Sequence, residues 1–301
     1  MESKYIEELK SGKYGTCLVD EPMKNHTTFK VGGPADLLIK PSSEEEIEEL
    51  VKYCKSNKLP LMIVGNGSNL LVKDSGIRGV VLKLDKNFNA IEFDGDRVIA
   101  QAGALLSTVS KKSFKKSLTG MERVSGIPAS IGGAMTMNAG AYGTEMKDIV
   151  EYVKCVDQDG NIRDYSNEEM HFRYRGSRVD DEKLTVISAT FKLEKGDFDT
   201  IMENFEDYDH RRRSKQPLEK ASAGSTFKRP EGHYASKLID DAGLRGFAYK
   251  DAQVSDKHCG FIINNGDASY EDIQELIHRV QDIVFEKYQV RLETEVKIVG
   301  D

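Results

Sequence analysis

The stretch that decides the fold is V-S-G-I-P-A-S-I-G-G-A-M-T-M-N-A-G-A-Y-G-T, residues 124–144. It has 21 residues without a charge, in a chain in which 31% of residues are charged, and it holds five of the 26 glycines. Small residues let backbone amides approach a ligand closely, and glycine also allows φ > 0. Ile127, Met135 and Tyr142 are residues that pack. The stretch predicts a buried loop facing a cofactor, and a plain tightly packed segment is the alternative.

Two other interpretations of this stretch are less favourable. A membrane span needs about 20 apolar residues, but the run contains Pro128 and Asn138, and the mean hydropathy of the chain is -0.50. A flexible linker would be rich in Ser, Gly and charged residues, whereas this run has no charge and contains several residues that pack. We therefore expect no membrane association through it.

The composition limits the class of protein. A chain of 301 residues with 39% hydrophobic content predicts two or three globular domains. The formal net charge of -7 argues against general binding to nucleic acid or anionic membranes. The first residues are charged and resemble no secretory signal, so we expect a cytoplasmic protein. The histidines lack metal-ligand spacing, and we expect no metal. The cysteines lie far apart and suit inert thiols in a reducing compartment: Cys17, Cys54, Cys155 and Cys259.

The N-terminal third has a β-α-β pattern. Residues 36–40 predict a strand, and a helix follows the Pro41-Ser42-Ser43 segment. Residues 61–64 form an apolar run that suits a strand of a parallel sheet covered by that helix. The apolar stripe of the helix has helical spacing: Ile47, Leu50, Val51 and Cys54.

The second strand leads into Gly65-Asn66-Gly67-Ser68-Asn69, a pattern that suggests phosphate binding. A dinucleotide-binding Rossmann unit is excluded on two counts. Leu70 stands at its third glycine position, and about a dozen residues before the next strand near Val80 leave too little room for a crossover helix. We interpret the segment as a turn whose amides hold a pyrophosphate without a helix dipole.

The rest of the chain predicts hairpins and then a smaller α/β unit. Turn signals predict hairpins around residues 94–96 and 158–161, and Ser166 with Glu169 predicts a capping box that opens a short helix. Composition shifts near Gly196 and Asp197, a plausible domain boundary. The further elements that we expect are helices at 105–117, 198–215, 234–242 and 270–288, a half-buried strand at 185–193, and strands at 260–264 and 291–299.

Six segments in register resemble the UDP-N-acetylenolpyruvoylglucosamine reductase family. The resemblance runs over nearly the whole chain, through residues 27–35, 65–69, 125–133, 174–177, 223–228 and 292–297. It implies an α+β fold with a PCMH-type (vanillyl-alcohol-oxidase-like) FAD-binding module. The two FAD-binding subdomains would be residues 1–84 and 85–196, and a smaller α/β substrate-binding domain would be residues 197–301.

The resemblance also implies the ligands. They are non-covalent FAD, NADPH and a UDP-sugar. Because no second nucleotide-binding β-α-β unit is evident in the sequence, we expect NADPH and the UDP-sugar to share one pocket in turn. The product would be UDP-N-acetylmuramate, for peptidoglycan. We expect these residues to bind FAD: Gly65, Asn66, Gly67, Ser68, Asn69, Ser125, Gly126, Pro128, Ser130, Ile131, Gly132, Gly133, Asn138 and Gly140.

The resemblance assigns three catalytic residues. Ser225 would donate the proton, while Arg175 and Glu295 would flank the negative charge that develops on the substrate. From their local sequence alone, these would be a surface arginine, a structural serine and an outward-facing strand carboxylate. The matched segments favour the catalytic interpretation.

Basic residues near these segments are candidates to bind the substrate's phosphates: Lys215, Lys228, Arg229 and Arg245. Arg229 stands where the family commonly has Asn, and Thr294 where it usually has Pro. No inserted Tyr-bearing loop is present, so the chain resembles the shorter, second type of the family.

Two other functions stay open on the sequence. One is a related FAD-dependent oxidase that acts on an alcohol or sugar, although neither glycine segment holds the His or Cys that often anchors its flavin. The other is a nucleotide-binding regulator, which would have no reason to keep Arg175, Ser225 and Glu295 together. For the reductase we expect a monomer that binds neither nucleic acid nor membrane.

Overall fold

The computed structural model describes residues 3–301 and divides into two compact units. Unit 1 comprises Met1–Val19, Leu37–Asn66 and Gly79–Arg211. Unit 2 comprises Asp20–Asp36, Gly67–Arg78 and Arg212–Asp301. Each unit is therefore assembled from three separate pieces of sequence, and the division into three consecutive domains stays a prediction.

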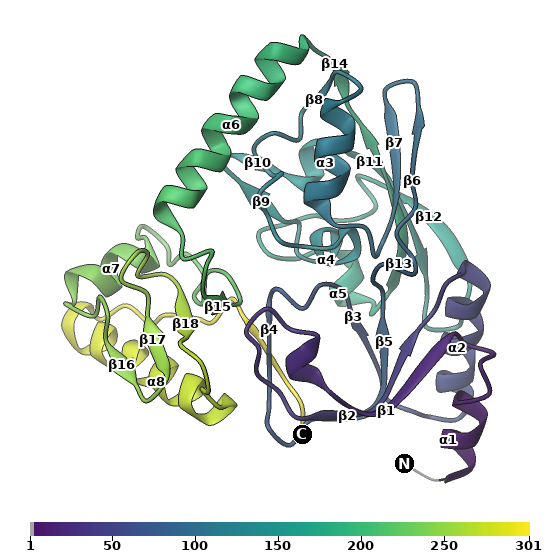
Figure 1. The fold of residues 1–301 in the computed structure, drawn as a ribbon, viewed down its shortest axis with the longest axis horizontal. Helices are drawn as coiled ribbons and strands as arrows, with labels where there is room; N and C mark the ends of the chain where they lie inside the picture. The colour runs from purple at the N-terminus through teal and green to yellow at the C-terminus, as the bar shows by residue number, and fades with distance from the viewer. Residues whose placement is uncertain (1–2) are drawn as a thin grey trace. The chain divides into compact units, whose positions relative to one another are not determined.

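Unit 1 contains a five-stranded antiparallel sheet in the order β12-β11-β13-β7-β6 (Figure 1). Its strands are β6 (Ile91–Asp94), β7 (Arg97–Gln101), β11 (Val150–Val156), β12 (Ile162–Ser166) and β13 (Thr185–Lys192). Both predicted hairpins are present. The strand predicted at residues 185–193 is β13, and the prediction that it is half-buried was wrong. It is the central strand of the sheet, and its residues from Thr185 to Ala189 are all buried.

A second sheet has the order β1-β2-β5-β3, and β3 and β5 run parallel as predicted. Its strands are β1 (Thr16–Pro22), β2 (Pro34–Lys40), β3 (Leu61–Val64) and β5 (Ile77–Lys83). The predicted helix is α2 (Glu44–Ser56), and the Ser43 side chain caps it by accepting from the Glu46 N–H. Its predicted apolar stripe is buried in the same core as Leu37 and Val80 of the sheet. The helix α1 (Ser3–Leu9) precedes β1.

The glycine-rich run is not only a loop, and this part of the sequence prediction was incomplete. It contains the helix α4 (Ile131–Thr136), which contacts β13 and β7. Further on, β9 (Gly140–Ala141) and β10 (Thr144–Glu145) form a short hairpin. Its two turn residues, Tyr142 and Gly143, both have positive φ angles, of 52° and 87°. Two positive φ angles in a two-residue loop match the twist of a hairpin.

The remaining elements of unit 1 are short, apart from one long helix. The capping bonds between Ser166 and Glu169 form as predicted, but the residues after them make a turn and no helix. The long helix α6 continues into unit 2. The elements are α3 (Leu106–Phe114), β8 (Leu118–Thr119), η2 (Met146–Asp148), α5 (Arg178–Asp181), β14 (Glu194–Lys195) and α6 (Phe198–Lys215).

Unit 2 is built on a four-stranded antiparallel sheet in the order β15-β18-β17-β16. The helix α8 contacts β16, β17 and β18, and α7 packs on α8 (Figure 1). The predicted strand at 291–299 is shorter in the structure, where β19 pairs in parallel with β4. The elements of unit 2 are η1 (Met23–Asn25), β4 (Leu70–Val72), β15 (Ala221–Ser222), α7 (Ala235–Asp241), β16 (Ala248–Tyr249), β17 (Ala252–Val254), β18 (Ile262–Asn264), α8 (Tyr270–Tyr288) and β19 (Lys297–Val299).

The core of unit 2 depends on residues from both ends of the sequence. Phe29, Val31 and Leu71 are buried with the apolar faces of α7 and α8. Within residues 3–301, no helix combines the length and apolar character that crossing a bilayer requires.

Candidate functional site

The residue after β3 approaches α4 so closely that a larger residue than glycine would have to displace a side chain. A Cβ atom on Gly65 would lie 2.0 Å from the Ser130 Oγ atom. Ser130 is buried, and its hydroxyl caps α4 by accepting from the Gly133 N–H at 3.4 Å. Gly65 and Ser130, both predicted to bind a cofactor, therefore also have a part in the packing and capping at this place.

The first amides of α4 are already used within the protein. The Ile131 N–H donates to the Ala104 carbonyl at 2.8 Å, and the Gly132 N–H donates to the Ala102 carbonyl at 2.9 Å. A Cβ atom on Gly132 would lie 3.2 Å from that of Ala102. The helix thus docks through its amino end on the segment after β7, and these amides are not open to a ligand.

The loop after β3 has amides that remain open. Within residues 3–301, no acceptor is found for the backbone N–H groups of Asn66, Gly67 and Ser68. Gly67 has φ +66°, and a Cβ atom there would lie 2.1 Å from the His26 carbonyl oxygen. The Asn69 side chain donates to the Glu295 carbonyl at 3.1 Å. Consecutive open amides in a glycine-containing turn suit a phosphate group.

The start of the glycine-rich run has a similar open amide. The Ser125 hydroxyl donates to the Glu122 carbonyl at 2.8 Å, which holds the turn. The Gly126 N–H has no acceptor in the described part of the chain. The Asn66 side chain donates to the Pro128 carbonyl at 2.7 Å and so connects this turn to the loop after β3. The residues at this place fit a nucleotide cofactor that brings its own acceptors.

Asn138, another predicted cofactor residue, is fully buried with φ 42°, and its side chain is engaged by the protein. It donates to the Glu145 carboxylate at 2.9 Å and to the Arg173 carbonyl at 3.2 Å, and it accepts from the Lys147 N–H at 3.0 Å. A Cβ atom on Gly140 would lie 2.7 Å from Glu145 Cγ. Both residues hold the β9–β10 hairpin.

Arg175 lies at the tip of a tight turn. The backbones of Arg173 and Gly176 exchange both hydrogen bonds, at 3.0 and 3.2 Å, so that Tyr174 and Arg175 form a two-residue loop. Arg175 has φ 56°, in the left-handed region that bulky residues rarely adopt. Its guanidinium lies 5.2 Å from the centre of the Tyr174 ring. Strained residues of this kind cluster at functional sites.

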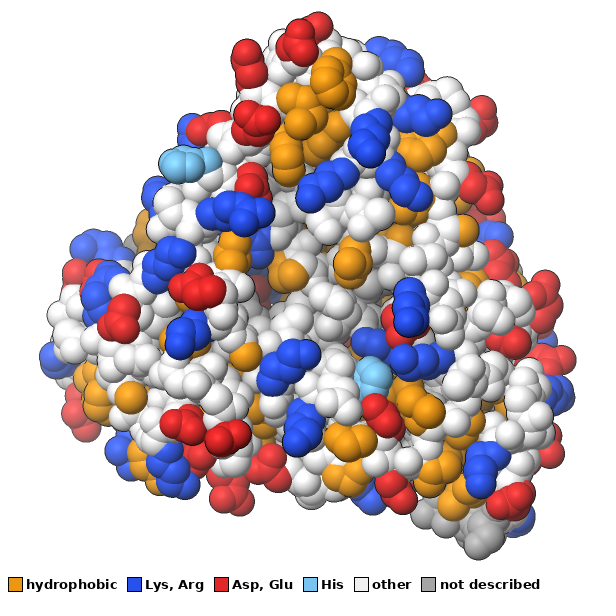
Figure 2. Space-filling model, in the orientation of Figure 1, with side chains coloured by type: hydrophobic (Ala, Val, Ile, Leu, Met, Phe, Trp, Pro, Cys, Tyr) orange, Lys and Arg blue, Asp and Glu red, His pale blue; other side chains and the backbone are white. Residues whose placement is uncertain are grey.

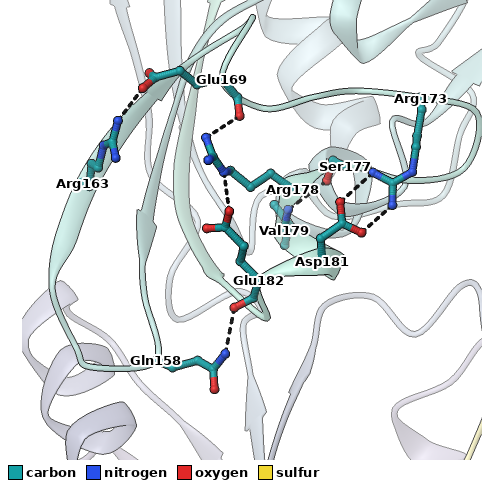
Figure 3. Close-up of polar contacts among 9 residues, drawn as sticks. All are labelled: Gln158, Arg163, Glu169, Arg173, Ser177, Arg178, Val179, Asp181 and Glu182. Atoms are coloured by element: carbon teal, nitrogen blue, oxygen red, sulfur yellow. Dashed lines mark hydrogen bonds and ion pairs between the residues drawn. The ribbon is translucent and has the colours of Figure 1, made fainter.

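A polar network holds the base of this turn (Figure 3). Arg173 makes a bidentate pair with Asp181, at 2.8 and 2.5 Å. The buried Ser177 caps α5 by accepting from the Val179 N–H at 3.3 Å. Arg178, the first residue of α5, pairs at 2.7 Å with Glu182, the residue that follows the helix. Since Asn138 binds the Arg173 carbonyl, the Arg175 turn is fixed from both the glycine-rich run and α5.

In unit 2, a short ladder brings two predicted catalytic segments together. Phe227 and Thr294 form an antiparallel bridge, and the Glu295 N–H donates to the Thr226 carbonyl at 2.8 Å. Ser225 and Glu295, both half-buried, therefore lie on adjacent segments. The buried Thr226 anchors the first segment because its hydroxyl accepts from the Ile262 N–H at 3.0 Å. Arg175, the third predicted catalytic residue, belongs to unit 1.

The predicted phosphate-binding cations of unit 2 differ in their surroundings. Lys228 pairs with the Glu293 carboxylate at 3.1 Å, and Arg245 makes a bidentate pair with Asp240 that raises its pKa. The Arg229 guanidinium lies 4.0 Å from the centre of the Tyr234 ring. Lys215 is exposed at the end of α6 and has no ion-pair partner within residues 3–301.

Charges of both signs are interspersed over the visible face of the molecule (Figure 2). Basic side chains gather over the region of α3, where Lys111 and Lys112 are exposed.

The sequence analysis missed Lys83, the last residue of β5. Only 6% of its surface is exposed, and its ammonium group donates to the Gly65 carbonyl. A lysine within the otherwise apolar run from Val80 to Leu84 was the available signal. The cysteines are free thiols, and burial raises the pKa of Cys54 and Cys155 to about 12. No group of three or more potential metal ligands occurs among residues 3–301.

Comparison with known proteins gives consistent matches over both units. Residues 35–166 match the family described as "FAD binding domain", and residues 216–299 match "UDP-N-acetylenolpyruvoylglucosamine reductase, C-terminal domain". A protein of Clostridioides difficile with that reductase name is 52% identical over 283 residues, which is 94% of this chain and 93% of the relative. One from Caldanaerobacter subterraneus is 50% identical, over 96% of this chain and 95% of the relative.

A solved structure is similar over the same length. The crystal structure of UDP-N-acetylenolpyruvylglucosamine reductase from Thermus caldophilus is 35% identical, with a TM-score of 0.82, and the match covers 94% of this chain and 98% of that chain. These relatives have the reductase name, so the oxidase alternative is less supported. The α+β fold with a PCMH-type FAD-binding module agrees with these matches.

Proposed function

The chain belongs to the UDP-N-acetylenolpyruvoylglucosamine reductase family, and from this premise we propose how its residues serve the reaction. It is an NADPH-dependent FAD oxidoreductase. It reduces the enolpyruvyl group of UDP-N-acetylglucosamine enolpyruvate to give UDP-N-acetylmuramate, a precursor of peptidoglycan. The individual residues that bind and react are the subject of the proposal.

The loop after β3 and the turn at Gly126 are proposed to hold the diphosphate of FAD. Their open N–H groups support this role, because a dianionic diphosphate supplies several acceptors. Gly65, Ser130, Ile131, Gly132 and Gly133 are proposed to shape this wall of the site through the docking of α4. Asn138 and Gly140 would act through the β9–β10 hairpin. Bound FAD supplies the two-electron chemistry that carries hydride from NADPH to C3 of the enolpyruvyl group.

Ser225, Arg175 and Glu295 are proposed to act on the substrate itself. When hydride reaches C3, negative charge develops next to the substrate carboxylate, and C2 must take up a proton. The Ser225 hydroxyl would donate this proton. Arg175, as a fixed cation, and Glu295, as a hydrogen-bond donor if its carboxyl group is protonated, would stabilise the developing charge.

The observation that carries this proposal is the ladder between residues 226–228 and 293–295. It holds Ser225 and Glu295 on adjacent segments although the two residues are far apart in sequence. The left-handed backbone of Arg175 is a second support, because such strain is retained where a side chain must be aimed.

The basic residues of unit 2 are proposed to differ in how readily they can bind a phosphate. Lys215, which has no partner within the described residues, is the best placed to meet a phosphate of UDP or NADPH. Lys228, Arg229 and Arg245 would have to exchange their present partners Glu293, Tyr234 and Asp240 to do so.

We also propose that NADPH and the UDP-sugar occupy one pocket in turn, and that the chain acts as a monomer in the cytoplasm. Both substrates are metabolites of the cytoplasm, which supports this location. Through peptidoglycan synthesis, the enzyme would contribute to cell shape and cell division.

The test compares Ser225→Ala with Ser222→Ala, a nearby serine in β15, by anaerobic stopped-flow absorbance. Reduction of the flavin by NADPH needs no proton on carbon and should stay near normal in both variants. Reoxidation by the enolpyruvyl substrate should slow by at least about 10²–10⁴-fold in Ser225→Ala only. If Ser225→Ala slows both half-reactions equally, the residue positions ligands and does not donate the proton.

A further inference from the structure

Lys83 is a buried cation that no step of the reaction uses. It is 94% buried, since 6% of its surface is exposed, and its ammonium group donates to the Gly65 carbonyl. Within residues 3–301, no carboxylate lies within ion-pair distance of this ammonium group. Asp85, two residues further on, pairs instead with Lys40 at 3.1 Å.

Burial of an ammonium group without a paired acid is unfavourable. Burial lowers the pKa of Lys83 from 10.5 to about 8, while the charge of Asp85 raises it and that of Lys40 lowers it. Near neutral pH the side chain is still cationic. One neutral carbonyl is a weak partner for such a charge, so the position favours an anion that arrives from outside the protein.

The position of Lys83 in the sheet indicates which anion this is. β3 and β5 are parallel, and Val64 pairs with Lys83 at their carboxyl ends. The loop with the open amides of Asn66, Gly67 and Ser68 begins at the next residue, Gly65. Of these amides, that of Asn66 belongs to the same unit as Lys83, and it follows directly on the Gly65 carbonyl that the ammonium group contacts, at the carboxyl edge of this sheet.

We infer that Lys83 is a positioning residue for FAD: it fixes the Gly65 carbonyl, and its buried charge favours the diphosphate at the start of the loop, beside the open amide of Asn66. The inference rests on the proposed binding of FAD by this loop. The Lys83 ammonium group contacts the first residue of the loop and is shielded from solvent, so salt screens its charge little.

The experiment measures FAD binding to apo-protein by fluorescence quenching between pH 6.5 and 9.5. The wild type should bind with constant affinity below about pH 7.5 and lose affinity above about pH 8, where Lys83 loses its proton. Lys83→Met should bind at least about tenfold more weakly at pH 7 and show no such loss. The binding of ADP, which has the diphosphate without the flavin, should weaken by a similar factor in Lys83→Met.

Three variants separate charge from shape. Lys83→Gln keeps a donor for the Gly65 carbonyl without the charge, and should behave like Lys83→Met. Lys83→Arg keeps the charge and should recover part of the affinity, with no loss up to pH 9.5. Lys192→Met breaks an exposed pair with Asp96 that does not act on the pKa of Lys83, so it is the matched control and should keep the wild-type profile. Circular dichroism of each variant confirms folding.

Wild-type affinity and an unchanged pH profile in both Lys83→Met and Lys83→Gln would overturn the inference. Gly67→Ala tests the loop itself, because its Cβ atom would lie 2.1 Å from the His26 carbonyl oxygen. If Gly67→Ala loses FAD while the Lys83 variants do not, the loop binds FAD and Lys83 plays no part. If Gly67→Ala also binds FAD normally, the proposed FAD site itself is wrong.

Discussion

The contact between Gly65 and the Ser130 hydroxyl predicts the outcome of a double-mutant cycle. An alanine Cβ at position 65 would lie 2.0 Å from Ser130 Oγ but 3.2 Å from Ser130 Cβ. The φ angle of Gly65 is outside the left-handed region, so alanine is otherwise tolerated there. Gly65→Ala must therefore displace one atom, the hydroxyl oxygen that caps α4.

The size of each effect follows from this geometry. Ser130→Ala removes the cap, which costs about 1 kcal/mol of the free energy of unfolding. Gly65→Ala displaces the same hydroxyl and adds crowding, so it should lower the free energy of unfolding by about 1–2 kcal/mol. The double variant should lose about 1 kcal/mol, because only the tight 3.2 Å contact with the Cβ of residue 130 remains and alanine at 65 stabilises by about 0.4–1 kcal/mol through the unfolded chain. The two changes are then coupled by at least about 1 kcal/mol.

Urea denaturation of the four apo-proteins measures this coupling, and FAD titration of the same samples reports on the site. The control is Gly266→Ala, because a Cβ atom there would meet nothing within 4 Å and the φ angle is ordinary. Combined with Ser130→Ala, it should show simple additivity. If the double variant instead loses the sum of the two single losses, the changes are additive and the packing argument is refuted.

Three further outcomes are expected. Asp181→Asn breaks the exposed pair with Arg173 and loosens the Arg175 turn, so reoxidation of the flavin by substrate should slow several-fold with little change in the thermal midpoint. The control is Glu182→Gln, which breaks the neighbouring pair with Arg178. Equal slowing in both variants would argue against a specific role of the Arg173–Asp181 pair. Burial lowers the pKa of Lys83 from 10.5 to about 8, so the unfolded chain holds this proton more tightly between these pH values. The free energy of unfolding of the apo wild type should therefore rise relative to Lys83→Met, by up to about 3 kcal/mol from pH 7.5 to 10, and a falling difference would contradict the assignment. Steady-state kinetics with NADPH and the UDP-sugar should give parallel double-reciprocal lines, whereas intersecting lines without mutual inhibition would indicate two separate sites.

Parts of the fold with regular periodicity could be predicted from the sequence. The stripe of α2 and the apolar run of β3 are local patterns, and both elements were predicted close to their bounds. The helix α4 was missed because glycine disfavours helix. Its stability comes from Ala102 and Ala104, which accept its first amides from another part of the chain. No local pattern in the sequence reports such a contact.

The candidate site was predictable only as a set of residue types. The resemblance singled out Ser225 and Glu295, but their adjacency depends on a ladder between distant segments. The left-handed backbone of Arg175 is equally invisible in the sequence, since arginine gives no sign of a positive φ angle. Lys83 was overlooked because lysine in a strand usually faces water, and only its burial reveals a different role.

The pairing of β4 with β19 has a consequence for synthesis on the ribosome. Leu70 leaves the ribosome long before its partner Lys297. At about 5–20 residues per second, the delay is roughly 10–45 s. During this time Phe29, Val31 and Leu71 lack the helices that bury them in the finished unit. We expect nascent chains to be substrates for chaperones over this interval, and fragments that stop before β19 to leave unit 2 unfolded.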